Sequence, residues 1–244
     1  MPTMHDATAC LNWAVMGVAA DSSHHLLDGT SAYANRYVGV EAFRAPGLAV
    51  ARDRTGAFHI TPRGIPAYAE RFLMTFGFYE GLAAAQAADG WLHIESDGKA
   101  AYCARFDWVG NWQQARCAVR TSNGHYFHIQ RDGEPAYDER YIYAGDFREG
   151  AAVVQRDDGT ATHIDANGRA LHGHWFLELD VFHKGYARAR DAAGWHHVNR
   201  AGKSAYRARF EAVDCFYNGQ AWVKSAAGEQ FVINEQGNVV RRIR

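Results

Sequence analysis

Residues 125–159 read HYFHIQRDGEPAYDERYIYAGDFREGAAVVQRDDG, and this stretch is one copy of a motif that the chain repeats. The preceding copy is WLHIESDGKAAYCARFDWVGNWQQARCAVRTSNG, residues 91–124. The same frame fits three further ranges closely and a fourth with small slippage: 57–90, 160–194, 195–228 and 22–56. Self-similarity at a fixed period of 34–35 residues indicates a repeat architecture.

A histidine recurs once per copy, and a turn that ends in glycine follows it. The histidines are His24, His59, His93, His128, His163 and His197, and Val232 stands at that place in a partial seventh copy. The glycines are Gly29, Gly64, Gly98, Gly133, Gly168, Gly202 and Gly237. Features shared by all copies are expected to build the unit, so a single site must come from what differs between copies.

Each copy is expected to form short antiparallel strands. Phe127 and Ile129 flank His128, and this alternation with period two predicts a strand with two different faces. An Asp-Gly or Asn-Gly pair then supplies the positive φ angles of a tight hairpin turn. A Tyr-x-x-Arg-aromatic segment, a segment with an aromatic residue and a glycine, and a last short strand complete the copy, giving three or four strands.

The predicted fold class is therefore all-β, with tandem repeats that bury their apolar faces by stacking. We favour a propeller-like closed ring of about six units over an open, twisted β-solenoid, because closure removes exposed strand edges. In that arrangement Glu229–Val240 pairs with a strand in Leu11–Ala19. The predicted organisation is an N-terminal segment, 1–21, that supplies the closing strand, and one repeat domain, 22–244, with six full units and a partial seventh.

Composition excludes several classes of function. The 26 basic and 27 acidic residues are mixed along the chain, which argues against binding to nucleic acid or to an anionic membrane surface. The apolar stretch Ala9–Ala20 is too short to span a bilayer and has no basic flank, so we expect neither a transmembrane helix nor a signal peptide. The four cysteines show no paired spacing, which favours free thiols and a cytoplasmic location.

The chain resembles the bacterial WG β-repeat family, whose units carry Trp-Gly-aromatic-Ile-Asp/Asn, a glycine turn and a Gly-aromatic segment. The matching residues are Trp91, Ile94 and Glu95 with Gly98, and the equivalent set Trp195, Val198, Asn199 and Gly202. The sequence departs from the family pattern where Leu92 or His196 replaces the glycine and the recurrent histidine replaces the aromatic residue. The resemblance, over roughly 22–240, implies a bacterial protein of a binding or interaction type.

The fifth copy differs most from the others and gives the first candidate site. His172 replaces the repeated tyrosine and Trp175 the repeated arginine. The candidate catalytic residues are His172, His174, Asp180, His183 and Lys184. Histidine titrates near neutral pH and a carboxylate fixes its tautomer, so such a group could bind a transition metal or act as a general acid-base pair. The alternative is a polar rim on a repeat that has drifted.

A second candidate site comes from the turn before the third segment's glycine, where the residues vary between copies. Equivalent positions of a repeat protein lie along one edge, so these side chains are expected to line a common surface. The predicted binding rim consists of Tyr79, Glu80, Gln113, Arg148, Tyr217 and Asn218. Trp112 occupies the repeated aromatic position and is expected in the core instead.

The recurrent histidines have two interpretations. They could bind metal, since imidazole is a common transition-metal ligand, and a weak third hypothesis is metal storage by a ladder that includes His93 and His128. We favour a structural role, in which each histidine hydrogen-bonds a tyrosine or arginine of its own or a neighbouring unit. A metal site needs three or four ligands in one shell, whereas these histidines recur one per unit.

The sequence favours a non-catalytic scaffold that binds a protein, a peptide or a small ligand through the variable rim. The alternative is a small cytoplasmic enzyme with its site in the fifth copy, with or without a transition metal. No P-loop, GxGxxG, GxSxG or HExxH motif is present, and no specific cofactor is expected. The oligomeric state is left open.

Overall fold

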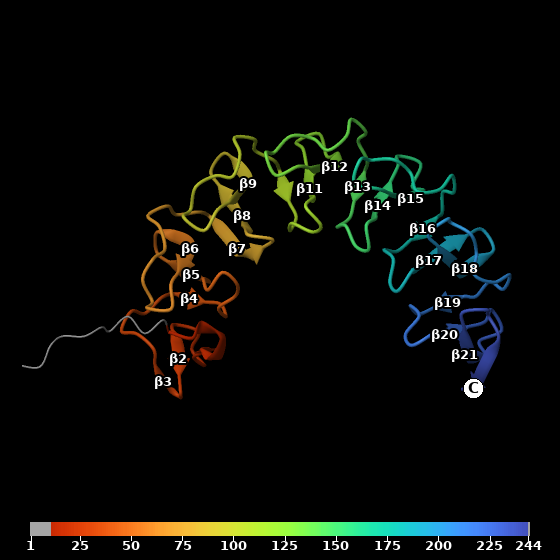
Figure 1. Cartoon of the computed structure of the whole chain (residues 1–244), viewed down its shortest axis with the longest axis horizontal. Helices are drawn as coiled ribbons and strands as arrows, with labels where there is room; N and C mark the ends of the chain where they lie inside the picture. The colour runs from red at the N-terminus through yellow and green to blue at the C-terminus, as the bar shows by residue number, and fades with distance from the viewer. Residues whose placement is uncertain (1–10, 244) are drawn as a thin grey trace, which may run out of the picture. The chain divides into compact units, whose positions relative to one another are not determined.

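The structure is a computed structural model that describes residues 11–243. It divides into two compact units, Met1–Asn111 and Trp112–Arg244, and the division falls inside the predicted repeat domain. Both units are series of small β-sheets in chain order (Figure 1). No helix in the described part of the chain is long and apolar enough to cross a membrane.

The first unit begins with a short 3-10 turn, η1 (Trp13–Val15), and continues with three-stranded sheets. Their strands are β1 (Gly17–Val18), β2 (His25–Leu27) and β3 (Thr30–Ser31), then β4 (Gly39–Val40), β5 (Ala49–Asp53) and β6 (Gly56–Ile60), then β7 (Met74–Tyr79), β8 (Leu82–Ala87) and β9 (Gly90–Ile94). β10 (Trp108–Val109) lies at the end of this unit.

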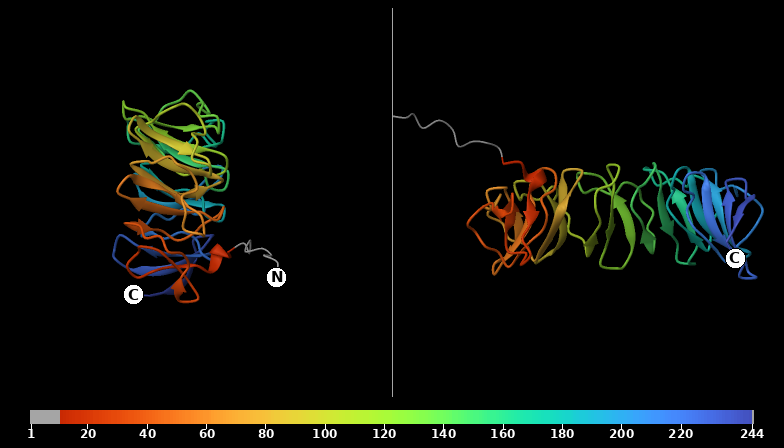
Figure 2. Two further views of the ribbon diagram at one scale, coloured as in Figure 1. Left: turned by 90° about the vertical axis from the view of Figure 1, so that its left-hand side faces the viewer. Right: turned by 90° about the horizontal axis from the view of Figure 1, so that it is seen from below.

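The second unit follows the same plan and ends in a sheet of four strands. Its strands are β11 (Cys117–Arg120) with β12 (Tyr126–Ile129), then β13 (Tyr143–Ala144), β14 (Ala152–Gln155) and β15 (Ala161–Ile164), then β16 (Glu178–Leu179), β17 (Tyr186–Asp191) and β18 (Gly194–Asn199), and last β19 (Ala212–Val213), β20 (Gln220–Lys224), β21 (Gln230–Asn234) and β22 (Val239–Arg242). Consecutive sheets within a unit lie side by side in both views of Figure 2. The all-β repeat is thus confirmed.

Strands β14 and β15 are buried on both faces. In the β14–β15 pair, Val153 lies opposite His163 and Ala152 opposite Ile164. All four residues of β15 are buried, as are three of the four in β14. The two faces alternate as predicted: Ile164 and Ala152 lie on one face, and the recurrent His163 lies on the other with Val153, where it is also covered.

The predicted closing pair does not form, which corrects one part of the fold prediction. Val18 of β1 pairs with His25 of β2, and β22 pairs with β21, each within its own local sheet. Among residues 11–243 no sheet closes on itself into a ring. A partner reached through a short loop costs less chain entropy than one at the other end of the chain, so the terminal strands pair locally. Part of the predicted N-terminal segment, residues 1–10, lies outside the described residues.

Each hairpin contacts the next one through an aromatic side chain that packs against a glycine. A Cβ atom built on Gly168 would lie 2.5 Å from Cγ of Tyr137 in the preceding copy, and one on Gly237 would lie 2.7 Å from Cγ of Tyr206. Gly168 also has a φ of 80°, in the left-handed region. Only glycine satisfies both the turn and the close approach, which explains why glycine and the aromatic ring recur together.

A second joint uses the backbone. Ala161 and Phe176 exchange two hydrogen bonds of 2.8 and 2.9 Å, which extend the edge of the β14–β15 sheet. The next residue, Leu177, donates instead to the carbonyl of Arg190 in β17. The chain therefore leaves one sheet and enters the next within a single residue, so neighbouring sheets have a fixed spacing.

Candidate functional site

A buried histidine network holds the frame on which the candidate site is built. In the fourth copy, Nδ1 of His128 lies 2.6 Å from the Tyr137 hydroxyl, and Nε2 lies 2.8 Å from the carbonyl oxygen of Gly145. A carbonyl oxygen only accepts, so Nε2–H must donate to it, and Nδ1 then accepts from the tyrosine. The neutral imidazole is therefore fixed in one tautomer.

The same pair of contacts recurs in the other copies. The Nε2 atoms of His59, His93, His163 and His197 lie 2.8–3.0 Å from the carbonyl oxygens of Phe76, Gly110, Asp180 and Asp214. Each acceptor lies 17 residues after its histidine, in the same copy but at or just after the first strand of the next sheet. The prediction of a structural histidine bonded to tyrosine is thus confirmed, and the same imidazole also fixes the backbone at the start of the next sheet.

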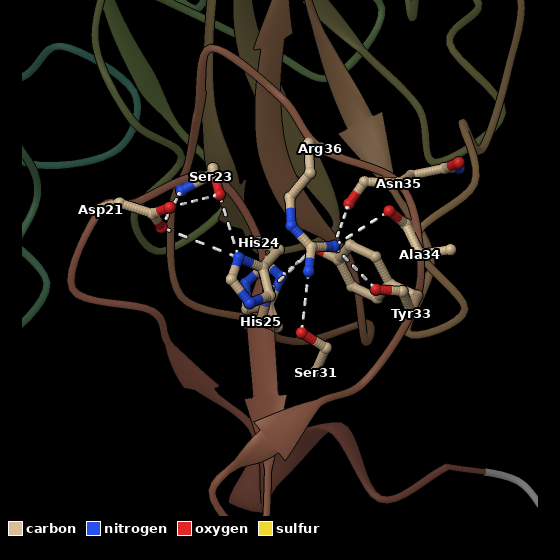
Figure 3. A network of polar contacts seen from close by, with 9 residues as sticks. All are labelled: Asp21, Ser23, His24, His25, Ser31, Tyr33, Ala34, Asn35 and Arg36. Atoms are coloured by element: carbon tan, nitrogen blue, oxygen red, sulfur yellow. Dashed lines mark hydrogen bonds and ion pairs between the residues drawn. The ribbon is translucent and has the colours of Figure 1, made fainter.

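In the first copy the structural histidine is His25, and the assignment of this role to His24 is wrong. Figure 3 shows His25 and Tyr33 together, with Nδ1 of His25 2.6 Å from the hydroxyl. His24 faces the other way and contacts Ser23 and Asp21. The first hairpin is one residue shorter between histidine and tyrosine, so counting the repeat backwards reaches the wrong neighbour.

The repeated arginines also serve the frame. Arg140 donates to the carbonyl oxygens of Tyr137, Asp138 and Glu139 at 2.8–3.1 Å. Its guanidinium lies 3.9 Å from the centre of the Phe127 ring. Arg36 contacts the corresponding three carbonyls of the first copy (Figure 3). The Tyr-x-x-Arg motif is therefore a device that closes the hairpin end.

Burial keeps the network histidines neutral. It lowers the pKa of His59, His128, His163 and His197 to about 4, against an ordinary value of 6.5. The carbonyl bonds oppose this shift only in part. Among the described residues no group of three or more histidine, cysteine or acidic side chains is arranged to hold a metal ion.

The residues that vary between copies stand on this frame in four-residue segments, which we call rim segments. Each starts at the residue whose carbonyl accepts from the histidine. The rim segments are 41–44 (EAFR), 76–79 (FGFY), 145–148 (GDFR), 180–183 (DVFH) and 214–217 (DCFY). In these five segments the third residue is a buried phenylalanine on the histidine ring, with centroids 4.0–4.6 Å apart. In the remaining rim segment, 110–113 (GNWQ), the third residue is the buried Trp112. The second position differs in every segment, and the first and fourth positions vary between segments.

Two rim segments of the second unit form its main pocket, with a volume of 730 Å³. Asp146 and Arg148 come from one segment and Asp180 and His183 from the next. Phe147 of the first segment also lines the pocket, together with Gln113, Tyr143 and Cys215 from outside the two segments. A concave site of this size, lined by both apolar and polar groups, can hold a small ligand or a peptide side chain.

Three of the polar side chains in this pocket are bonded to another residue, and within the described part of the chain Asp146 is not. Arg148 donates to Nδ1 of His183 at 3.0 Å, because a guanidinium has no acceptor. Asp180 is bound to Arg188, whose Nε lies 2.5 Å from its carboxylate. Asp146 has no hydrogen bond or ion pair to another residue within 11–243, and the pocket walls partly desolvate its carboxyl and raise its pKa. Asp146 is thus the pocket's open acceptor.

The first unit has a smaller counterpart, of 300 Å³, at the equivalent place. Arg44, Phe76 and Tyr79 of two rim segments line it, together with Trp108. Phe76 and Tyr79 are partly exposed, so this pocket presents aromatic surface where the second unit presents acidic and basic groups. One frame therefore carries two chemically different pockets.

The five candidate residues of the fifth copy separate into two groups. His172 and His174 lie at the hairpin end, with ring centroids 5.9 Å apart, and His172 is bonded to His163. Asp180 and His183 line the pocket, and Lys184 follows in the adjoining turn. No contact between side chains joins the two groups among the described residues. The convergence that the enzyme hypothesis requires is not found.

The predicted rim residues occupy the ends of the rim segments and the turns that follow. Gln113 and Arg148 line the 730 Å³ pocket, and Tyr79 lines the 300 Å³ pocket. Tyr217 is exposed next to Lys184, and Glu80 and Asn218 take the first positive-φ position of their turns. Trp112 is fully buried, as expected. Sequence reasoning missed Asp146 and Tyr143; the spacing of 17 from each histidine marks Gly145, the residue between them.

Comparison with known proteins identifies a fold and no family. No protein-family model and no curated protein matches the chain. Among solved structures, the computationally designed Ika8 protein is 15% identical, with a TM-score of 0.50 over 93% of this chain and 83% of that one. BamB from Moraxella catarrhalis is 13% identical (TM-score 0.48; 96% and 86% covered), and the WD40 β-propeller domain of Doa1 is 12% identical (0.37; 89% and 88%). At such identities the likeness concerns the fold alone.

Proposed function

We propose that the protein is a non-catalytic scaffold that binds a peptide or a small polar ligand in the pocket between rim segments 145–148 and 180–183. The observation that carries this proposal is that each copy combines constant buried positions with variable positions around the pocket. A buried histidine and a buried aromatic residue recur, while the side chains that surround the pocket vary between segments. Binding faces of repeat proteins are built from variable residues on a constant frame.

The chemistry of the pocket favours a ligand that carries both a donor and an acceptor. Asp146 offers an open carboxylate, and Arg148 uses one nitrogen for His183, which leaves its other N–H groups available. Tyr143 is half exposed and adds an aromatic surface. The resemblance to WG β-repeats and the cytoplasmic location inferred from the cysteines belong to the same proposal.

The test is selection of peptides from a random library on the whole protein. We expect selected peptides to bind the wild type at least tenfold more tightly than an Asp146→Ala/Arg148→Ala variant. A matched control, Asp157→Ala/Arg169→Ala, removes the same charges from exposed positions outside the pocket and should bind as the wild type does. Selection of no sequence, or equal binding to all three proteins, would reject the proposal.

One observation favours a second candidate, an enzyme in the same pocket. A thiol, an imidazole and a carboxyl group, from Cys215, His183 and Asp146, line it together. Alkylation of Cys215 by iodoacetamide, followed by mass spectrometry across pH, separates the two functions. An activated thiolate would react at full rate at pH 7, whereas an ordinary thiol reaches half its maximal rate near pH ~8.5. Reaction at full rate at pH 7 would favour the enzyme over the scaffold.

A further inference from the structure

The turns that follow the rim segments present pairs of backbone N–H groups. In the second unit both central residues of these turns have positive φ: 51° and 74° at Glu149–Gly150, 53° and 83° at Lys184–Gly185, and 50° and 73° at Asn218–Gly219. This is the geometry of a two-residue hairpin turn of type I′. Successive N–H groups in such turns form a concave site that attracts an anion or another acceptor.

Two of these turns are occupied by a side chain from the preceding turn. The Gly150 amide donates to Oε1 of Gln114 at 2.8 Å. The amides of Lys184 and Gly185 donate to the two carboxylate oxygens of Glu149, at 2.7 and 3.0 Å. The carboxylate of Glu149 thus spans the two amides of the turn. In both cases the acceptor occupies the first positive-φ position of the turn before.

The third junction lacks such an acceptor, because that position holds Lys184. An ammonium group has three donors and no acceptor, so it cannot cap the next turn. Its Nζ lies 4.4 Å from the centre of the Tyr217 ring, directly beside the turn. Within residues 11–243 the amides of Asn218 and Gly219 donate to no acceptor. A pair of donors that binds a carboxylate one copy earlier is therefore open here and flanked by a cation.

We propose that the Asn218 and Gly219 amides, together with Lys184, bind the carboxylate of an acidic side chain on a protein partner. The inference rests on the proposed function, since it assigns one anchor of the partner that the rim binds. Glu149 supplies the model for the ligand, and two carboxylate oxygens match the two amides. Tyr217 is 68% exposed and offers aromatic contact beside the anchor.

Glu235, an acidic residue beside the turn, limits the affinity of this site for a carboxylate. Oε1 of Glu235 lies 3.8 Å from the position of a Cβ built on Gly219, and its carboxylate is hydrogen-bonded to Tyr186. Its negative charge opposes that of a ligand. We therefore expect millimolar binding of a free carboxylate, about 4 kcal/mol or less, and useful affinity only when the rest of the partner also binds.

The experiment is a titration of the 15N-labelled full chain with sodium acetate at constant ionic strength, followed by amide chemical shifts. We expect saturable shifts at Asn218 and Gly219 and none at the amides of Lys184 and Gly185, which Glu149 already caps. Lys184→Glu supplies the missing acceptor from the chain itself and should abolish the acetate-dependent shifts. Lys203→Glu, with the same charge change at an exposed site away from the turn, should keep them.

The outcomes separate this inference from the proposed function. Absence of saturable shifts at Asn218 and Gly219, or equal shifts in the Lys184→Glu variant, would overturn the anchor. Saturation by inorganic phosphate but not by acetate would also overturn it, since the ligand would then not be a carboxylate. The titration needs no partner, so failure of the peptide selection with intact acetate shifts would reject only the proposed function.

Discussion

The fourth and fifth hairpins perform the same structural task with different chemistry. In the fourth, the Tyr137 hydroxyl donates to Nδ1 of His128 at 2.6 Å. In the fifth, Nε2 of His172 takes the place of the hydroxyl, 3.1 Å from Nδ1 of His163. The frame thus requires a donor nine residues after the histidine, and not a phenol in particular.

The replacement leaves a polar atom without a partner. Because Nε2 of His172 must donate to His163, its Nδ1 is left as an acceptor. That atom is buried and has no hydrogen-bond partner among the described residues. Burial and the nearby His174 lower the pKa of His172, so the fifth hairpin holds two neutral imidazoles where the fourth holds one. A buried, unsatisfied acceptor costs about 1–3 kcal/mol.

The hairpin ends differ as well. Arg140 satisfies three carbonyls in the fourth copy, and Trp175 cannot do so in the fifth. Instead, the guanidinium of Arg156 stacks 3.6 Å from the centre of the Trp175 ring, and the Thr162 hydroxyl donates to the His174 carbonyl at 2.9 Å. These contacts partly replace the missing arginine in the fifth copy. Among the described residues, more buried polar side-chain atoms lack a hydrogen-bond partner there than in the fourth copy.

Lowering the pH should have the largest effect on stability. The fifth hairpin should open at a higher pH than the fourth. The network histidines have a pKa of about 4 when folded and about 6.5 when unfolded, so the unfolded chain binds extra protons between these values. The free energy of unfolding is highest above pH ~6.5 and decreases as the pH falls towards ~4. The total decrease is about 3 kcal/mol for each histidine. Hydrogen exchange should show protection of 161–164 lost at higher pH than that of 126–129. Simultaneous loss in both strands would remove the distinction.

Removal of a network histidine should be the next largest effect. His128→Phe leaves the Tyr137 hydroxyl and the Gly145 carbonyl without their partner in a buried site. We expect a loss of about 3–5 kcal/mol in free energy of unfolding, measured by urea denaturation. His125→Phe, three residues earlier and only half buried, is the control and should cost less than about 0.5 kcal/mol. A cost below ~1 kcal/mol for His128→Phe would mean that the network is not structural.

Exchanging the two hairpins' donors should move stability in opposite directions. His172→Tyr removes the unpartnered nitrogen and should stabilise the protein by about 1–2 kcal/mol, while Tyr137→His should destabilise it by a similar amount. Gly202 faces His172 as Gly168 faces Tyr137, so a phenol has the same space. Thermal denaturation of both variants at pH 7 tests this. If both changes destabilise, the fifth site is adapted to imidazole.

Substitution of Trp175 at the hairpin end should have the smallest effect on stability. Trp175→Arg restores the carbonyl contacts but removes the stack with Arg156, which is worth about 0.5–1 kcal/mol at an exposed site. We expect a net change within about 1 kcal/mol of the wild type, in thermal denaturation. Trp175→Ala loses the stack and restores nothing, so it should melt lower than Trp175→Arg. The reverse order would show that the carbonyls need no guanidinium.

The repeat made the hairpins predictable, because histidine, glycine and tyrosine each have a contact that recurs in every copy. Two errors have local causes. The first hairpin is a residue shorter, which moved the structural role from His24 to His25. The expected pairing of Leu11–Ala19 with Glu229–Val240 assumed a single closed ring, whereas both terminal strands find partners through short loops.

The site was less predictable, since proximity across copies does not follow from spacing alone. Arg148 and His183 occupy equivalent positions, and these do meet. His172 and His183 lie in the same copy, but one closes the hairpin and the other ends a rim segment. Asp146 carries no signal of its own; only the 17-residue step from His128 to Gly145 points to its segment.

The ring-on-glycine joint has a consequence for how such a chain changes length in evolution. Each copy brings a glycine that accepts the ring of the copy before it and a ring that covers the glycine of the copy after it, as Gly168 and His172 do. Both halves of the joint are thus inherited together. Unequal recombination can add or delete a whole copy without inventing a new contact, while the rim residues of each duplicate remain free to diverge towards different ligands.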